Sequence, residues 1–178
     1  MSNLSPIERT RAWVESFVIG LNLCPFAKKE LVNDRIRFHA TNVGTENDLL
    51  LELKKELELL QGNSSIETTL LIHPSVLNDF ADYNQFLGLA DDLLVTLHLE
   101  GIFQIASFHP DYQFADTHPD DAENYTNRSP FPTLHLLREE SLEKAIEHYD
   151  DVSLIPARNI AKMNEMGVAK LIALQEGK

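Results

Sequence analysis

Apolar residues recur at three- and four-residue spacing over long stretches of the chain, which is typical of helices that bury one face. Helix-capping residues mark where these stretches begin. Ser5-Pro6-Ile7-Glu8 forms a capping box with proline at the first helical position, and Thr45 and Ser75 precede two further periodic stretches. The pattern predicts helices over 5–22, 45–62, 75–100, 141–149 and 156–174, with a break or kink at Gly167.

Four shorter stretches have the pattern of strands. Thr68–Ile72 and Ile102–Phe108 are continuous apolar runs, as in strands that are buried on both faces. Ile36–Val43 alternates apolar and polar residues, and Thr133–Leu137 forms a fourth run. Because the first three strands alternate with helices, right-handed crossovers should make them parallel.

We therefore expect an α/β fold with one domain over residues 1–178. Its sheet should be mixed but mostly parallel, with about four strands packed with helices, and residues 165–178 should form a looser C-terminal helix. The length of 178 residues and the hydrophobic content of 43% suit a single core of this kind.

Charge and cysteine content narrow the possible partners and location. A net charge of −13 argues against nucleic acid and anionic membrane surfaces as partners, because both are bound by clustered Lys and Arg. No stretch approaches the roughly 18 apolar residues of a membrane helix, and charges in the first twenty residues exclude a signal peptide. With the single Cys24, these features predict a soluble, acidic, cytoplasmic protein of unknown oligomeric state.

Residues 109–132 form a long segment between the last two predicted strands that fits neither helix nor strand. Such loops are usually functional or disordered, and four aromatic residues make this one too apolar for disorder. We expect an ordered loop that helps to build a site. The aromatic residues are Tyr112, Phe114, Tyr125 and Phe131.

A His-Pro pair follows each of the two buried strands and supplies the candidate acid/base groups. If the strands are parallel, His73 and His109 lie at the carboxyl edge of the sheet, where α/β proteins bind ligands. A helix that begins at Ser75 would favour a neutral His73. His109 is the stronger candidate, because the carboxylate of Asp111 two residues later could orient its ring. The alternative is that each histidine simply marks the end of a strand.

Arg128 is the candidate anion-binding residue, with Asn127, Ser129 and Tyr112 as further hydrogen-bonding groups of the substrate site. Its planar guanidinium fits a carboxylate or a phosphate, so a small anionic ligand is the expected partner. The alternative is a surface salt bridge to an acidic residue of the same loop.

Metal and nucleotide sites receive less support. Cys24, His73, His109 and Asp111 include ligand types for zinc or iron, but no HExxH or paired CxxC motif accompanies them. Cys24 lies in an apolar context and is expected to be a buried structural thiol. The sequence has no GxGxxG, P-loop or GxSxG motif. We therefore assign no metal and leave the cofactor unknown.

Several stretches resemble a known bacterial family, domain of unknown function family 1415. They are GLNLCPFA (20–27), TTLLIHP (68–74), FADYNQFLGLADDLL (80–94), GIFQIASFHPDYQF (101–114) and NYTNRSPFPTLHLLRE (124–139). The resemblance extends from about residue 11 to 164. It implies a small, soluble, single-domain bacterial protein and supplies no catalytic residue.

Three functions fit these observations, in order of preference. The first is a small-molecule enzyme with an acid/base His site and an Arg anion clamp at the carboxyl ends of the strands. The second is a ligand-binding or regulatory module that uses the same pocket without turnover. The third is a protein–protein adaptor that presents the aromatic 112–131 segment, which would then form an exposed patch.

Overall fold

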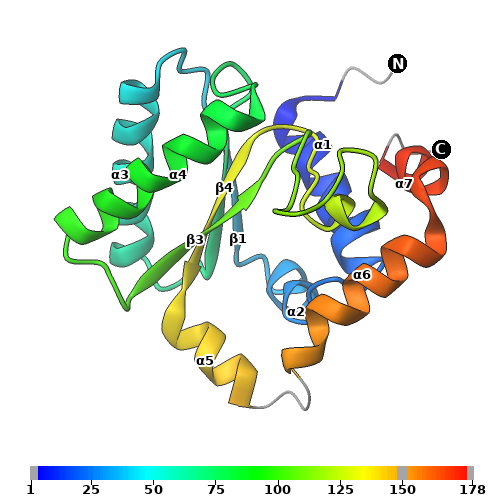
Figure 1. Cartoon of the computed structure of the whole chain (residues 1–178). Coiled ribbons are helices and arrows are strands. Elements are labelled where there is room, and N and C mark those ends of the chain that lie inside the picture. Colours follow the sequence, from blue (N-terminus) through cyan, green and yellow to red (C-terminus); the bar gives the residue numbers. More distant parts are fainter. Residues whose placement is uncertain (1–3, 148–151, 176–178) are drawn as a thin grey trace.

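Two layers of helices enclose a four-stranded sheet in the computed structural model, which describes residues 4–147 and 152–175 (Figure 1). The strands are β1 (Ile36–Ala40), β2 (Thr68–Ile72), β3 (Phe103–Phe108) and β4 (Thr133–Arg138). The helices of the described residues are α1 (Pro6–Trp13), α2 (Ala27–Val32), α3 (Glu46–Gly62), α4 (Phe80–Thr96), α5 (Glu139–Glu147), α6 (Ile155–Met166) and α7 (Val168–Gln175). None of them is both long and apolar enough to cross a membrane.

The sheet has the order β1-β2-β4-β3, so the predicted α/β class with four strands is confirmed. β1 pairs with β2 in parallel, whereas β4 pairs antiparallel with both β2 and β3. The prediction of a mostly parallel sheet is therefore wrong, and the sheet is mixed. β2 and β3 run in the same direction, as expected, but β4 lies between them. The long 109–132 loop allows this insertion, because it returns the chain to the edge where β3 ends.

One core lies between the sheet and the layer formed by α3 and α4 (Figure 1). Leucines at helical spacing on α3 and large side chains of α4 pack against alternate residues of the strands. Fully buried members of this core include Leu49, Leu53, Leu57, Leu60, Leu71, Tyr83, Leu134 and Leu136.

A second core covers the other face of the sheet, beneath the layer that contains α1, α6 and α7 (Figure 1). Trp13 of α1 packs edge-on against Phe108 at the end of β3, with ring centroids 5.3 Å apart. A 3₁₀ turn within the 109–132 loop, Ala122–Thr126, contributes Tyr125 to this core. Leu171 of α7 is fully buried here, so this helix contributes to the second core.

Most of the predicted helix boundaries are confirmed. Ser5 and Glu8 form the expected capping box, and the Thr45 hydroxyl accepts a hydrogen bond from the Asp48 N–H. Gly167 separates α6 from α7 with a φ of +75°. α5 is described only to Glu147, so its expected end at Tyr149 lies outside the described residues.

The predicted start of the third helix at Ser75 is wrong. α4 begins after Asp79, whose carboxylate accepts hydrogen bonds from the N–H groups of Ala81 and Asp82. Residues 73–79 instead form a turn in which Leu77 has a φ of +58°. Since Ser and Asp are both good caps, composition alone did not separate the two positions. The argument that a helix terminus adjoins His73 therefore fails.

The first helix continues beyond α1 as a π-helix, Val14–Ile19. This π-helix ends at Gly20, whose backbone keeps a right-handed helical conformation. A Cβ atom at Gly20 would lie 2.1 Å from the Ser16 carbonyl oxygen, closer than any real contact. Glycine is therefore required at this position by the local geometry.

Candidate functional site

His73 and His109 both lie at the carboxyl edge of the sheet, because β2 and β3 run in the same direction. The two imidazoles pack against the same residue, Tyr83 of α4, with ring centroids 5.9 and 5.1 Å from its ring. The Tyr83 hydroxyl donates to the Thr133 carbonyl and accepts from the Phe108 N–H. This tyrosine therefore connects both histidines to the ends of β3 and β4.

Both ring nitrogens of His109 are engaged. Nε2 lies 3.1 Å from the Leu77 carbonyl oxygen, and the backbone N–H of Asp111 donates to Nδ1 at 3.0 Å. Since a carbonyl can only accept, the proton is on Nε2 and the ring is neutral. Burial lowers the pKa of His109 below its usual value. It is the backbone of Asp111 that fixes the ring, rather than its carboxylate as we expected.

His73 is fully buried and has one nitrogen without a partner. Its Nδ1–H donates to the Val76 carbonyl at 3.0 Å, so the ring is neutral with its lone pair on Nε2. No hydrogen-bond partner of Nε2 is found among the described residues. Burial lowers the pKa of His73 to about 4.

The histidines therefore hold two successive carbonyls of the 73–79 segment. His73 binds that of Val76, and His109 binds that of Leu77. These contacts explain how Leu77 is kept in the left-handed region, which is costly for a residue with a Cβ atom. They fix the wall of a cleft.

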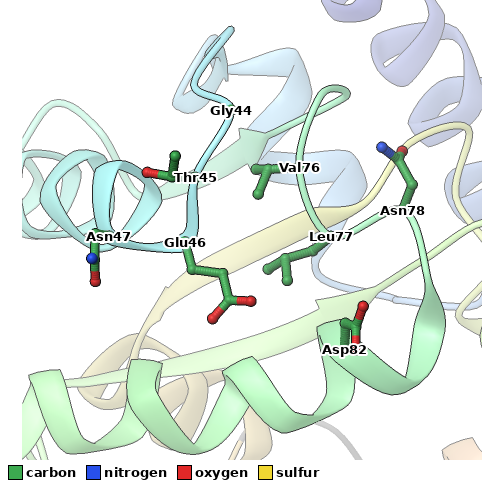
Figure 2. Close-up of a pocket in the computed structure, with 8 residues that line it drawn as sticks. All are labelled: Gly44, Thr45, Glu46, Asn47, Val76, Leu77, Asn78 and Asp82. Atoms are coloured by element: carbon green, nitrogen blue, oxygen red, sulfur yellow. The ribbon is translucent and has the colours of Figure 1, made fainter.

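This cleft, which we call the edge cleft, has a volume of about 470 Å³. It opens between the segments that follow β1 and β2, where α3 and α4 begin (Figure 2). The 73–79 segment supplies one wall and the start of α3 supplies the other. The lining residues are Gly44, Thr45, Glu46, Asn47, Val76, Leu77, Asn78 and Asp82.

The charge of the edge cleft is negative. Figure 2 shows Glu46 on the α3 side and Asp82 on the α4 side of Leu77. The N-terminus of each helix contributes about half a positive charge, whereas each carboxylate carries a full negative charge. Since the lining residues include no Lys or Arg, the carboxylates outweigh the two dipoles. The cleft is suited to cations and to hydrogen-bond donors.

Arg128 and its neighbours hold the 109–132 loop together. Arg128 donates to the carbonyls of Tyr112 and Pro119, and its guanidinium lies 4.6 Å above the Tyr125 ring. The Asn127 amide donates to the Ser107 carbonyl, and the Ser129 hydroxyl donates to the Phe131 carbonyl. The backbones of Asn127 and Ser129 also pair with that of His109. The predicted binding residues thus lie near His109, with these donors engaged by backbone carbonyls.

Asn124 is the residue of this loop that sequence reasoning overlooked. It is fully buried, and its Oδ1 accepts hydrogen bonds from the Phe114 N–H and the Thr117 hydroxyl at 3.0 and 2.9 Å. Its Nδ2 donates to the His118 carbonyl at 2.7 Å. In the sequence, the only indication of this role was a side-chain amide within a segment rich in turn-forming residues. Asn127 has the same amide in the same segment, so the sequence does not distinguish the two residues.

None of the four aromatic residues of the loop is in the exposed class. Tyr125 is buried, and Tyr112, Phe114 and Phe131 are half-buried. Tyr112 packs against Phe80 and Phe114, with ring centroids 5.1 and 4.9 Å apart. An adaptor function would therefore have to use aromatic side chains that are at least partly covered.

Cys24 is half-buried and free, so the expectation of a buried thiol was wrong. Within residues 4–147 and 152–175, no three His, Cys, Asp or Glu side chains are grouped so as to hold a metal ion. The four metal-ligand candidates from the sequence are therefore not brought together as one site in the described structure.

Comparison with known proteins places the chain in a family without an assigned activity. The model of the family described as "Protein of unknown function (DUF1415)" matches residues 5–173, so the chain belongs to this family. No curated protein and no solved structure matches the chain.

Proposed function

We propose that this member of the DUF1415 family binds a small polar cation in the edge cleft, as a ligand-binding or regulatory module. The observation that carries the proposal is a cleft at the carboxyl ends of parallel β1 and β2 with a wall that two buried histidines fix. Its volume of about 470 Å³ falls in the range of small-molecule sites, and this edge is where α/β sheets bind ligands.

The fixed wall supports binding more than turnover. A wall that is already ordered lowers the entropic cost of association. Both ring nitrogens of His109 are engaged, Nε2 by the Leu77 carbonyl of the wall and Nδ1 by the Asp111 N–H, and His73 is fully buried. Glu46, Asp82 and the side-chain amides of Asn47 and Asn78 then remain as the polar groups at the cleft. An amine would find both charge and hydrogen-bond acceptors there.

Isothermal titration calorimetry with three ligands of equal length tests the proposal. We expect 1,4-diaminobutane to bind with a Kd on the order of millimolar, and 1,4-butanediol and succinate not to bind, because the carboxylates select for charge. The double variant E46Q/D82N should abolish binding of the diamine. D92N, which removes an exposed carboxylate elsewhere on α4, should retain it. Equal binding by wild type and E46Q/D82N would exclude this site.

A second candidate is a small-molecule enzyme with His73, His109 and Asp111 as acid/base groups and Arg128, Asn127, Ser129 and Tyr112 as substrate-binding groups. It is favoured by the Nε2 atom of His73, which is buried and has no hydrogen-bond partner in the described part of the chain. An unpaired buried nitrogen costs about 1–3 kcal/mol, and such a group in a native protein needs an explanation. Since His73 is fully buried, substrate could reach this atom only if neighbouring residues moved.

This second candidate is tested with a metabolite extract from bacterial cells. An enzyme should deplete a metabolite over hours, as followed by mass spectrometry, and H73Q should deplete none. H118Q, which removes an exposed histidine, is the matched control. The absence of depletion by the wild type would leave only the binding function.

We also propose a cytoplasmic location. It is supported by the acidic composition and by the single cysteine, which has no partner for an intramolecular disulfide. Fractionation of cells that express the protein tests it, and recovery from the periplasmic fraction would contradict it.

A further inference from the structure

A second cavity lies on the other side of the sheet, between α6 and the turn that follows the first helix. It has a volume of about 200 Å³, and we call it the α6 pocket. Its lining residues are Leu21, Asn22, Pro25, Ile155, Arg158, Asn159 and Lys162. Three of them belong to the stretch GLNLCPFA, which neither proposed function uses.

The residues that line the α6 pocket include two basic ones, in contrast to those of the edge cleft. Arg158 and Lys162 are four residues apart on α6, which places both on one face of the helix. None of the residues that line the pocket is acidic, although the chain as a whole carries a net charge of −13. Among the described residues, Lys162 has no ion-pair partner, so an anion would displace no carboxylate from it.

The walls of the α6 pocket are fixed relative to each other. The Asn159 amide donates to the Leu23 carbonyl at 2.9 Å and joins α6 to the turn. Within the turn, the Leu23 N–H donates to the Val18 carbonyl at 2.8 Å. Asn22 has a φ of +54°, a conformation that asparagine tolerates better than most residues. The pocket is therefore formed before any ligand arrives.

We propose that the α6 pocket binds a small organic oxyanion, a carboxylate or a phosphate monoester with a compact apolar part. The oxyanion would contact Lys162, and the apolar part would pack against Leu21, Pro25 and Ile155. A volume of about 200 Å³, less than half that of the edge cleft, suits a small metabolite. This site is independent of the edge cleft.

Isothermal titration calorimetry with phenyl phosphate, benzoate and benzyl alcohol tests the proposal. One or both anions should bind saturably with a stoichiometry of one, and the neutral alcohol should not bind. Comparison of the two anions shows whether the pocket prefers phosphate or carboxylate. K162Q should weaken the preferred anion roughly tenfold or more, because it removes a charge-assisted hydrogen bond.

The matched control is K170Q, which replaces an exposed lysine on α7 outside the pocket. This substitution should change the Kd for the anion less than about twofold. K162R, which keeps the charge, should bind better than K162Q and thus separates loss of charge from loss of folding. E46Q/D82N should bind the anion as the wild type does, so failure of this site and failure of the edge cleft are distinguishable. Absence of saturable binding, or equal weakening by K162Q and K170Q, would overturn the proposal.

Discussion

The buried neutral His73 should make the folded state sensitive to acid. Its imidazole is fully buried, and burial lowers its pKa to about 4, whereas an unfolded chain has a histidine pKa of about 6.5. Below pH 6.5 the unfolded state therefore binds a proton that the folded state rejects. The stability that comes from a neutral His73 is complete above pH 6.5 and is lost as the pH falls towards 4.

The expected magnitude follows from the two pKa values. A difference of about two and a half pKa units corresponds to about 3 kcal/mol of unfolding free energy over the full window. Most of it should be lost between pH 7.5 and 4.5. No reduction for solvent screening applies, because the ring has no exposed surface.

The measurement is the urea-induced unfolding of wild type, H73Q and H118Q at several pH values in this window. H73Q cannot bind the proton, so it should lose about 2–3 kcal/mol less than the wild type between pH 7.5 and 4.5. H118Q lacks an exposed histidine and should follow the wild type. NMR titration of the His73 ring gives an independent pKa in the folded state.

Two results would refute this reasoning. One is an identical loss of stability in wild type and H73Q. The other is a His73 resonance that titrates near pH 6.5 while the protein remains folded, since this would mean that water reaches the ring.

Three further substitutions test other parts of the structure. Gly20→Ala should lower the free energy of unfolding by about 3 kcal/mol, because the new Cβ would meet the Ser16 carbonyl, whereas Gly88→Ala places its Cβ in open space and should raise this free energy by about 0.5–1 kcal/mol. Urea denaturation measures both variants, and equal effects would contradict the π-helix geometry. Asn124→Ala should lower the free energy of unfolding by about 2–3 kcal/mol and expose the 109–132 loop to limited proteolysis, whereas Asn124→Asp keeps the acceptor oxygen and should have a smaller effect. Unchanged cleavage of Asn124→Ala would show that the amide does not organise the loop. Arg138→Met should lower the free energy of unfolding by about 1–2 kcal/mol, because the guanidinium binds carbonyls at the end of α3, including that of Asn63 at 3.0 Å. Thermal melting measures this effect, and an unchanged Tm would count against the role of Arg138.

Local signals in the sequence predicted the elements that depend on local interactions. Ser5 and Glu8 specify the first helix terminus through contacts three residues apart, and Thr45 specifies the next in the same way. The break at Gly167 could also be predicted from a local property, because its positive φ favours glycine. The α/β class follows from the order of these elements along the chain.

The position of β4 in the sheet could not be predicted in this way. An apolar run such as Thr133–Leu137 suits a parallel or an antiparallel neighbour equally well, so the run does not specify its partners. The choice depends on where the 109–132 loop returns the chain, and that loop is organised by Asn124 and by the packing of Tyr125 against α6 and α7. These are long-range contacts that no local pattern reports.

The candidate site shows the same division between residue type and placement. His73, His109 and Arg128 were selected for the chemistry of their side chains, and all three lie close to the predicted edge of the sheet. In the folded chain, however, each of them donates to at least one backbone carbonyl of an irregular segment, and such carbonyls must be satisfied when the segment is buried. A segment with few regular hydrogen bonds needs polar side chains for its own structure, and it therefore resembles an active site in sequence.

The charge at each candidate binding site also depends on which residues the fold brings together. Glu46 and Asp82 are ordinary first-turn residues of two helices, and they become one negative cleft only because β1 and β2 are adjacent and parallel. Asn22 and Lys162 lie at opposite ends of the sequence and share a pocket only because Asn159 joins α6 to the first turn. Net charge predicts that this protein repels polyanions, but a small anion responds to the few groups within a Debye length of about 10 Å. A strongly acidic chain can therefore contain one site for cations and another for anions, and the ligands of each must be sought separately.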